Sequence, residues 1–337
     1  MGWKENKENS LLQVLIKRRK MRKINLINLF FVLLYICCGS GNETSNSTSS
    51  DTTPPNFKVA FIGDQALGVD SVAVLQLIKD EGSDMVIHSG DFDYEDDPDA
   101  WDQQINGVLG PNFPYFASIG NHDVGKWSEY QKKLEERLNR INGASCKGDL
   151  GVNSACSYKG LFLILSGVGT KGSGHVSYIK NQLANNNSIW RICSWHKNQR
   201  LMQVGDKPDQ VGWGPYEECR KGGAIIATAH NHAYARTHLM EDFESQTIAS
   251  TSNTLRIEKG KTFAFVSGLG GRNFDEQNDE LAANDWWAAV YTPDQDAEFG
   301  ALFCTFNEGG VENKAHCYFK DIYGRIPDQF DVESGVK

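Results

Sequence analysis

Residues that could hold metal ions follow apolar runs at five places in this 337-residue sequence. The five segments read "GDQA" (63–66), "GDFDY" (90–94), "GNHD" (120–123), "CSWH" (193–196) and "AHNH" (229–232). Carboxylates, imidazoles, amide oxygens and phenol oxygens are metal ligands, and a metal site needs several of them together. Because residues beyond the carboxyl ends of strands meet at one edge of an open α/β sheet, the pattern predicts one site built from all five segments.

The elements that must position these segments alternate between apolar strands and amphipathic helices. Residues 57–141 contain three apolar runs, each followed by a pattern typical of a helix. Four more apolar runs lie between residues 161 and 268, and residues 300–324 have the pattern of an antiparallel hairpin. Since no internal repeat or second linker interrupts the sequence, we expect one α/β domain.

The five segments resemble the sequence blocks of the calcineurin-like metallophosphoesterases, and more narrowly those of the purple acid phosphatases. That group is marked by GDxG, GDxxY, GNH(D/E), VxxH and GHxH, and the second and third blocks match strictly. Elsewhere Ala66, Cys193 and Ala229 replace residues of the pattern, which changes the backbone around the ligands but not the ligands. The resemblance covers roughly residues 57–325 and implies a four-layer αββα sandwich with a single catalytic domain.

The resemblance also implies two metal ions and their ligands. The ligand set is Asp64, Tyr94 and His232 at the first ion, Asn121, His196 and His230 at the second, and Asp91 shared between them. Many members of the wider superfamily have Asp-x-His in the first block, where this chain has Asp64-Gln65-Ala66. Tyr94 would fill the position left by that missing histidine.

The ligand types suggest which metals the two sites prefer. A phenolate is a hard, basic oxygen ligand, and a trivalent ion can hold it ionised, so Tyr94 favours Fe(III) at the first site. The amide oxygen and two imidazoles of the second site suit Zn(II), Mn(II) or Fe(II). The alternative is that Tyr94 packs on the core, in which case both ions would be ordinary divalent ions.

The function implied by the resemblance is hydrolysis of phosphomonoesters, in which a hydroxide on or between the metals attacks phosphorus in line. His122 would hydrogen-bond the phosphate and protonate the leaving alkoxide, with Asp123 orienting it. A phosphodiesterase of the same superfamily is the first alternative. A secreted metal-binding module without turnover is the second, and the complete ligand set argues against it.

The charge of the sequence bears on its partners. The first 40 residues hold eight Lys/Arg and two Asp/Glu, which leaves a net charge of about −15 from Gly41 onward. A body this acidic argues against nucleic acid or an anionic membrane surface as the main partner. A small phosphorylated substrate stays compatible with it, because metal ions supply positive charge locally.

The N-terminal region has the composition of a targeting segment. "KRRKMRK" precedes about sixteen uncharged, mostly apolar residues and then "GSG", so residues 1–40 are expected to be a signal peptide that directs export to an extracellular or periplasmic location. The alternative is an uncleaved signal anchor, which would attach the protein to a membrane facing outside. Residues 41–56 are expected to be a Ser/Thr-rich linker, and residues 326–337 a C-terminal tail.

Six cysteines follow the expected signal peptide, and an even number in an exported chain suggests disulfides. None has the close spacing of a zinc site. A Cys146–Cys156 bond would close a glycine-containing loop, and a Cys304–Cys317 bond could bridge the expected hairpin. The complete connectivity does not follow from the sequence, and buried free thiols are the alternative.

Overall fold

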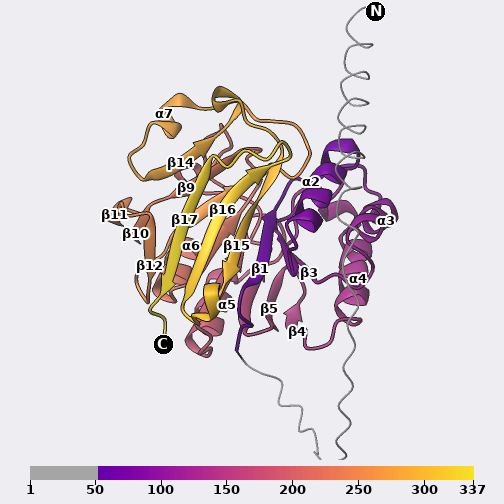
Figure 1. Cartoon of the computed structure of the whole chain (residues 1–337), viewed down its shortest axis with the longest axis horizontal. Helices are drawn as coiled ribbons and strands as arrows, with labels where there is room; N and C mark the ends of the chain where they lie inside the picture. The colour runs from indigo at the N-terminus through magenta and orange to yellow at the C-terminus, as the bar shows by residue number, and fades with distance from the viewer. Residues whose placement is uncertain (1–51) are drawn as a thin grey trace, which may run out of the picture. The chain divides into compact units, whose positions relative to one another are not determined.

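A computed structural model describes residues 52–337, which fold around two β-sheets (Figure 1). The expected signal peptide and most of the expected linker lie outside the described residues. The first sheet contains, in spatial order, β12 (Thr254–Ile257), β17 (Asp328–Ser334), β16 (Lys314–Asp321), β15 (Gly300–Phe306), β1 (Phe57–Ile62), β2 (Met85–His88) and β3 (Tyr115–Ala117). The second contains β14 (Trp287–Tyr291), β9 (Tyr234–Thr237), β13 (Ala264–Ser267), β8 (Ile225–Thr228), β7 (Trp190–Ser194), β6 (Leu161–Ser166), β5 (Asn153–Tyr158) and β4 (Ser145–Asp149). A separate pair is formed by β10 (Leu239–Asp242) and β11 (Thr247–Ser250).

Helices cover the outer faces of both sheets. The α-helices are α2 (Val69–Asp80), α3 (Pro98–Val108), α4 (Trp127–Leu138), α5 (His175–Ala184), α6 (Gly214–Lys221) and α7 (Asp279–Ala282). Short 3₁₀ helices are η1 (Val124–Lys126), η2 (Arg200–Met202), η3 (Pro293–Gln295) and η4 (Glu308–Gly310). The group α2 to α4 lies on the first sheet and the pair α5 and α6 on the second, which confirms the expected αββα sandwich (Figure 1).

The two sheets pack through aromatic side chains on their inner faces. Phe61 of β1 meets Phe265 of β13 edge to face, with 5.2 Å between the ring centroids. The four apolar strands expected between residues 161 and 268 are all present in the second sheet. The ring of Tyr234 of β9 lies 4.4 Å from that of Phe319 of β16 between centroids, with the two planes tilted by 34°. These contacts join the sheets into one core, which fixes their edges relative to each other.

Parallel pairing brings the chemical segments to one edge. β1 pairs with β2 and β2 with β3 in parallel, and β7 pairs in parallel with both β6 and β8. The candidate ligands of the five segments follow β1, β2 and β3 in the first sheet and β7 and β8 in the second, so they lie beyond the carboxyl ends of strands in both sheets.

The C-terminal residues are part of the sheet, and the expected tail at 326–337 is wrong. β17 lies inside the seven-stranded sheet, antiparallel to β16 and parallel to β12. Its residues alternate between buried and more exposed positions, and Phe330 and Val332 join the core. The short period-2 pattern is easily overlooked because its outward residues are charged or polar.

All six cysteines after residue 51 form disulfides. Cys146–Cys156 joins directly opposed residues of β4 and β5, and Cys304–Cys317 joins directly opposed residues of β15 and β16. The third bond links Cys193 of β7 to Cys219 of α6 and is buried. The expected disulfides are therefore confirmed, and the alternative of free thiols is wrong.

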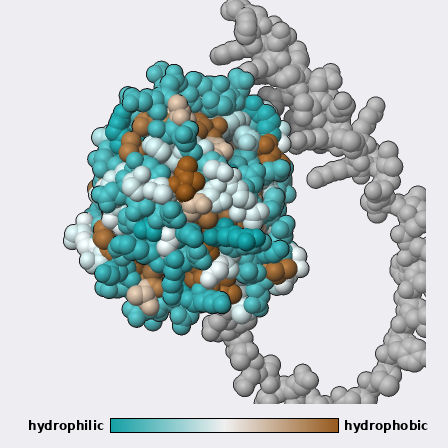
Figure 2. Space-filling model, turned by 90° about the vertical axis from the view of Figure 1, so that its left-hand side faces the viewer, coloured by the Kyte–Doolittle hydropathy of each residue, from teal (hydrophilic) through white to brown (hydrophobic). Residues whose placement is uncertain are grey.

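The face that carries β10, β11 and α7 is mostly hydrophilic, with apolar residues scattered over it (Figure 2). Single exposed apolar residues are normal on soluble proteins, so this face gives no sign of a large apolar interface. Within residues 52–337, none of the helices has the length and apolar character needed to cross a membrane.

Candidate metal centre

The loops after the strands hold several candidate ligands in an unusual backbone conformation. Asp64, Asp91, Tyr94 and His230 have φ values of 55°, 61°, 63° and 67°, in the left-handed region. Residues other than glycine seldom adopt this region, and the strain is often found where a side chain must be aimed at a functional site. In this structure these four left-handed residues all lie in the loops that follow the strands.

The first candidate cluster consists of Asp64, Tyr94 and His232. The Tyr94 hydroxyl donates to Asp64 Oδ1 at 2.9 Å and lies 3.1 Å from His232 Nε2, which is itself 3.3 Å from Asp64 Oδ1. Burial and the nearby Asp64 and Asp91 carboxylates raise the pKa of Tyr94 well above its usual value, so these residues by themselves favour the protonated phenol. Three oxygen and nitrogen donors therefore converge at one point.

The second cluster consists of Asp91, His196 and His230, whose donor atoms all lie within 4.8 Å of one another. His196 Nε2 is 3.2 Å from Asp91 Oδ2 and 3.1 Å from His230 Nδ1. Burial opposes protonation of His196, but the Asp91 carboxylate outweighs it and raises the pKa of His196 to about 9. Burial and the charge on His196 lower the pKa of His230 to about 2.

The outer nitrogen of each histidine in this cluster has a partner. His196 Nδ1 lies 2.9 Å from the carbonyl oxygen of Ser89, and His230 Nε2 lies 3.0 Å from Gln210 Oε1. Protonated His196 can donate from Nε2 to His230 Nδ1, which lies 3.1 Å away. If a metal ion took the place of that proton, both nitrogens could direct their lone pairs at the ion while the outer nitrogens kept their partners.

Asn121 provides an independent test of whether the site suits a metal. Its Oδ1 atom is buried and has no hydrogen-bond partner within residues 52–337. A buried amide oxygen without a partner is costly, and it calls for an ion or a water. Together with the two clusters, this oxygen fits a pair of metal ions, and six of the seven expected ligands already meet in two groups.

Asp123 holds two loops together, and within residues 52–337 its carboxylate makes no hydrogen bond to the His122 ring. Its buried carboxylate accepts hydrogen bonds from the backbone N–H groups of Gly120, Asp91 and Phe92 at 2.7, 3.0 and 2.8 Å. A Cβ on Gly120 would lie 2.1 Å from the Asp91 nitrogen, so only glycine allows this approach. Asp123 is thus a positioning residue for Asp91.

His122 lies at the exposed mouth of the site. Its backbone N–H donates to Asp91 Oδ1 at 2.9 Å, and its ring packs against Tyr94 at 4.4 Å between centroids. The anchored backbone fixes where the side chain begins, while the imidazole stays open to a molecule that enters.

The structure adds supporting residues from loops that carry no recognisable sequence pattern. Gln210 holds His230 as described. Asp275 accepts from the His232 backbone N–H at 2.9 Å and from Asn231 Nδ2 at 3.0 Å, and Lys207 Nζ lies 3.3 Å from it. These residues lie outside the five segments and in no motif, so only the folded chain reveals their contacts.

Solved structures support the fold. A purple acid phosphatase, PPD1, from seeds of yellow lupin (Lupinus luteus) matches with a TM-score of 0.60 at 17% identity, covering 84% of this chain and 55% of that chain. This chain thus spans about half the length of the lupin protein. GAP50, the anchor in the inner membrane complex of Plasmodium, matches with a TM-score of 0.53 at 12% identity over 83% of this chain and 89% of that one. PhoD matches with a TM-score of 0.50 at 11% identity over 84% and 71%.

Comparison of the sequence with family models assigns the chain more specifically than the structural matches do. A search of curated proteins gives no match to the sequence. The sequence model of the calcineurin-like phosphoesterases matches residues 57–234, which is more than half of the chain. That segment contains both clusters, Asn121, His122 and Asp123. Because the match covers more than half of the chain and contains all five segments of the candidate site, the protein belongs to the calcineurin-like phosphoesterases, hydrolases that act on phosphoric ester bonds.

Proposed function

We propose that the protein is an exported phosphatase of the purple acid phosphatase type, which hydrolyses small phosphomonoesters at a pair of metal ions. The observation that carries this proposal is the presence of two donor clusters, together with the amide oxygen of Asn121, which is buried without a partner within residues 52–337. The residue after Asn121, His122, donates its backbone N–H to Asp91. Two cations in such a site stabilise charge on the attacking and leaving oxygens of an in-line displacement.

The residues around the ions have distinct tasks. Asp91 would be shared by both ions, Asp64, Tyr94 and His232 would hold the first, and Asn121, His196 and His230 would hold the second. Gln210 and Ser89 orient the two histidines of the second site through their outer nitrogens. His122 hydrogen-bonds the phosphate and gives a proton to the leaving oxygen, since its ring is open at the mouth.

Export is supported by the three disulfides, because such bonds persist in oxidising compartments. We expect the mature protein to begin after about residue 38. Mass spectrometry of the secreted protein checks this, and a chain that keeps residues 1–38 would favour the membrane-anchored alternative.

The experiment that tests the function is metal analysis combined with a panel of phosphomonoesters and phosphodiesters. We expect two metal ions per chain and faster hydrolysis of monoesters. Faster hydrolysis of diesters would favour a phosphodiesterase of the same family. A metal-loaded protein that hydrolyses neither would favour a binding module, a role consistent with a fold that also occurs in an anchor protein.

Tyr94 should give the protein a visible colour. We propose that it binds Fe(III) as a phenolate, because a trivalent ion overcomes the carboxylates that otherwise raise its pKa. Charge transfer from phenolate to Fe(III) absorbs visible light, so Tyr94→Phe should remove the band. Absorption spectroscopy of the purified protein checks this. A colourless, fully active wild type that holds only Zn or Mn would contradict the assignment.

His122→Ala should separate catalysis from metal binding. We expect both metals to stay bound while kcat falls by about 10²–10⁴-fold, as is typical for a positioned acid or base. The loss should be smaller for 4-nitrophenyl phosphate than for an alkyl phosphate, because nitrophenolate leaves without a proton. Equal losses would make His122 a phosphate-binding group only, and loss of a metal would mean that the third segment is wrongly assigned.

A further inference from the structure

Arg272 lies at the mouth of the site, and no oxygen atom of residues 52–337 pairs with its guanidinium. Its Cζ atom lies 4.4 Å from the centroid of the Tyr94 ring, and its side chain is exposed. The other arginines within residues 52–337 all pair with a carboxylate or carbonyl oxygen through a hydrogen bond or an ion pair; they are Arg137, Arg140, Arg191, Arg200, Arg220, Arg236, Arg256 and Arg325. In an acidic protein, an arginine left unpaired beside the site is a candidate for binding an anion.

The backbone that carries Arg272 is fixed to the loop of the first cluster. Its N–H donates to the Asp64 carbonyl oxygen at 3.0 Å, and Gly270 N–H donates to the Gly63 carbonyl oxygen at 3.0 Å. Gly271 has a φ of 135°, and a Cβ there would lie 2.6 Å from Ser71 Cα, so the loop needs glycine to dock this closely. Arg272 therefore has a defined starting point next to Asp64.

The Arg272 guanidinium and the His122 ring have the Tyr94 ring as a common neighbour. Tyr94 carries both neighbours on its ring, since His122 packs against it at 4.4 Å between centroids and Arg272 stacks on it at 4.4 Å. Stacking orients the planar guanidinium but uses none of its N–H groups, which stay available for oxygens of an incoming ligand.

We propose that Arg272 is a specificity-determining residue that binds a terminal phosphoryl oxygen of the substrate and favours monoesters over diesters. The inference rests on the proposed phosphatase function. A phosphomonoester has three terminal oxygens and a charge near −2 at neutral pH, whereas a diester has two terminal oxygens and a charge of −1. A monoester therefore offers Arg272 both more charge and an oxygen not needed elsewhere in the site.

The test compares the metal-loaded wild type with Arg272→Gln, Arg272→Lys and a control. Arg256→Gln is the control, because it removes the same charge from an exposed side chain on the edge strand β12. The measurements are kcat/KM for 4-nitrophenyl phosphate and for bis(4-nitrophenyl) phosphate, the metal content, and the Kd of inorganic phosphate by calorimetry.

For Arg272→Gln we expect kcat/KM for the monoester to fall by about 10- to 100-fold, the range of a charge-assisted hydrogen bond. The Kd of phosphate should rise by a similar factor, while the diester changes by less than about 3-fold and the metal content stays the same. Arg272→Lys should recover part of the loss because it keeps the charge without the planar fork. The control should match the wild type.

Equal losses on both esters, an unchanged Kd for phosphate, or a loss of metal would each overturn the inference. Failure of the proposed function has a different signature, since a wild type that hydrolyses neither ester would refute the phosphatase. The calorimetric measurement would still decide whether Arg272 binds a phosphate oxygen.

Discussion

Asp91→Ala is expected to remove bound metal and to lower phosphoester hydrolysis by at least about 10⁴-fold. The loss should exceed that of a single acid or base group, because the metal ions would be lost with the carboxylate. The Asp91 carboxylate is buried, lies 3.2 Å from His196 Nε2 and accepts the His122 backbone N–H at 2.9 Å. It also contributes to the raised pKa of Tyr94, which places it near the first cluster. Removing it would take away the only donor that we assign to both ions.

The measurement is metal content by elemental analysis together with turnover of 4-nitrophenyl phosphate. Glu95→Gln is the matched control, because it removes the same charge four residues further along the same loop, where the side chain is exposed. The control should keep both metals and near-normal activity. If Asp91→Ala retained two metal ions, the shared role of Asp91 would be refuted.

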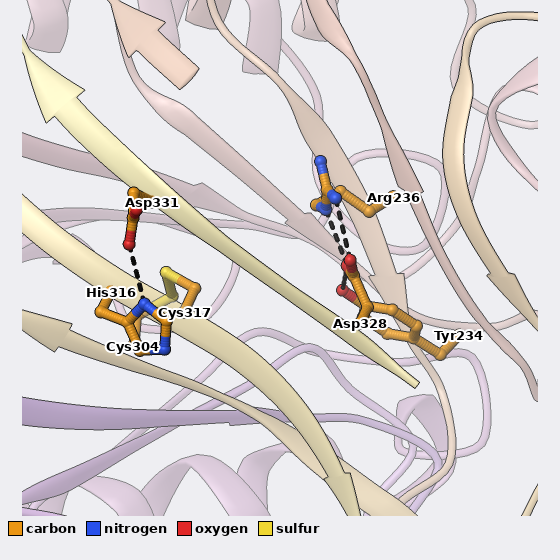
Figure 3. Close-up of a disulfide and its surroundings, with 7 residues drawn as sticks. All are labelled: Tyr234, Arg236, Cys304, His316, Cys317, Asp328 and Asp331. Atoms are coloured by element: carbon orange, nitrogen blue, oxygen red, sulfur yellow. Dashed lines mark hydrogen bonds and ion pairs between the residues drawn. A yellow bond between two sulfur atoms is a disulfide. The ribbon is translucent and has the colours of Figure 1, made fainter. Parts of the chain in front are cut away.

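Asp328→Ala is expected to be the most destabilising single change away from the site, by about 3–5 kcal/mol. Asp328 lies at the start of β17, and its carboxylate accepts from Arg236 Nε at 2.7 Å, from Arg236 Nη2 at 2.9 Å and from the Tyr234 hydroxyl at 2.6 Å (Figure 3). Arg236 and Tyr234 belong to β9, so the buried pair connects the two sheets. Without Asp328 the Arg236 guanidinium would stay buried and uncompensated.

A control for this prediction lies on the same strand. Asp331 pairs with His316 at 2.8 Å, but both side chains are partly exposed (Figure 3). Asp331→Ala should therefore cost no more than about 1 kcal/mol. The free energy of unfolding of both variants can be measured by denaturant titration with the disulfides intact. Similar losses for the two would show that burial does not set the strength of the Asp328 pair. Because whole domains are stable by only about 5–15 kcal/mol, the expected loss is readily measured.

The sequence by itself determined the core of the candidate site. An apolar run precedes each of five candidate ligands, which are Asp64, Asp91, Asn121, His196 and His230. These runs form strands in the core because burial of apolar side chains is favourable. Once parallel pairing is assumed, the ends of β1, β2 and β3 must lie side by side, and so must those of β7 and β8. The packing of the two sheets then brings the two groups of residues together. The hairpin disulfides follow in the same way, since Cys146 and Cys304 lie close in sequence to their partners.

Only the tertiary structure decided the contacts of the loop residues around the site and the place of β17 in the first sheet. Asp123 looked like a partner of His122, yet its carboxylate is taken by three backbone N–H groups, whose direction no sequence pattern encodes. Gln210 and Arg272 come from loops of low regularity, and they reach the site because other parts of the fold hold those loops. β17 became an inner strand because Asp328 and Phe330 find partners on strands far away in sequence. Long-range contacts of this kind are set by packing of the whole chain, whereas strands and their ends are set by local patterns of apolar residues.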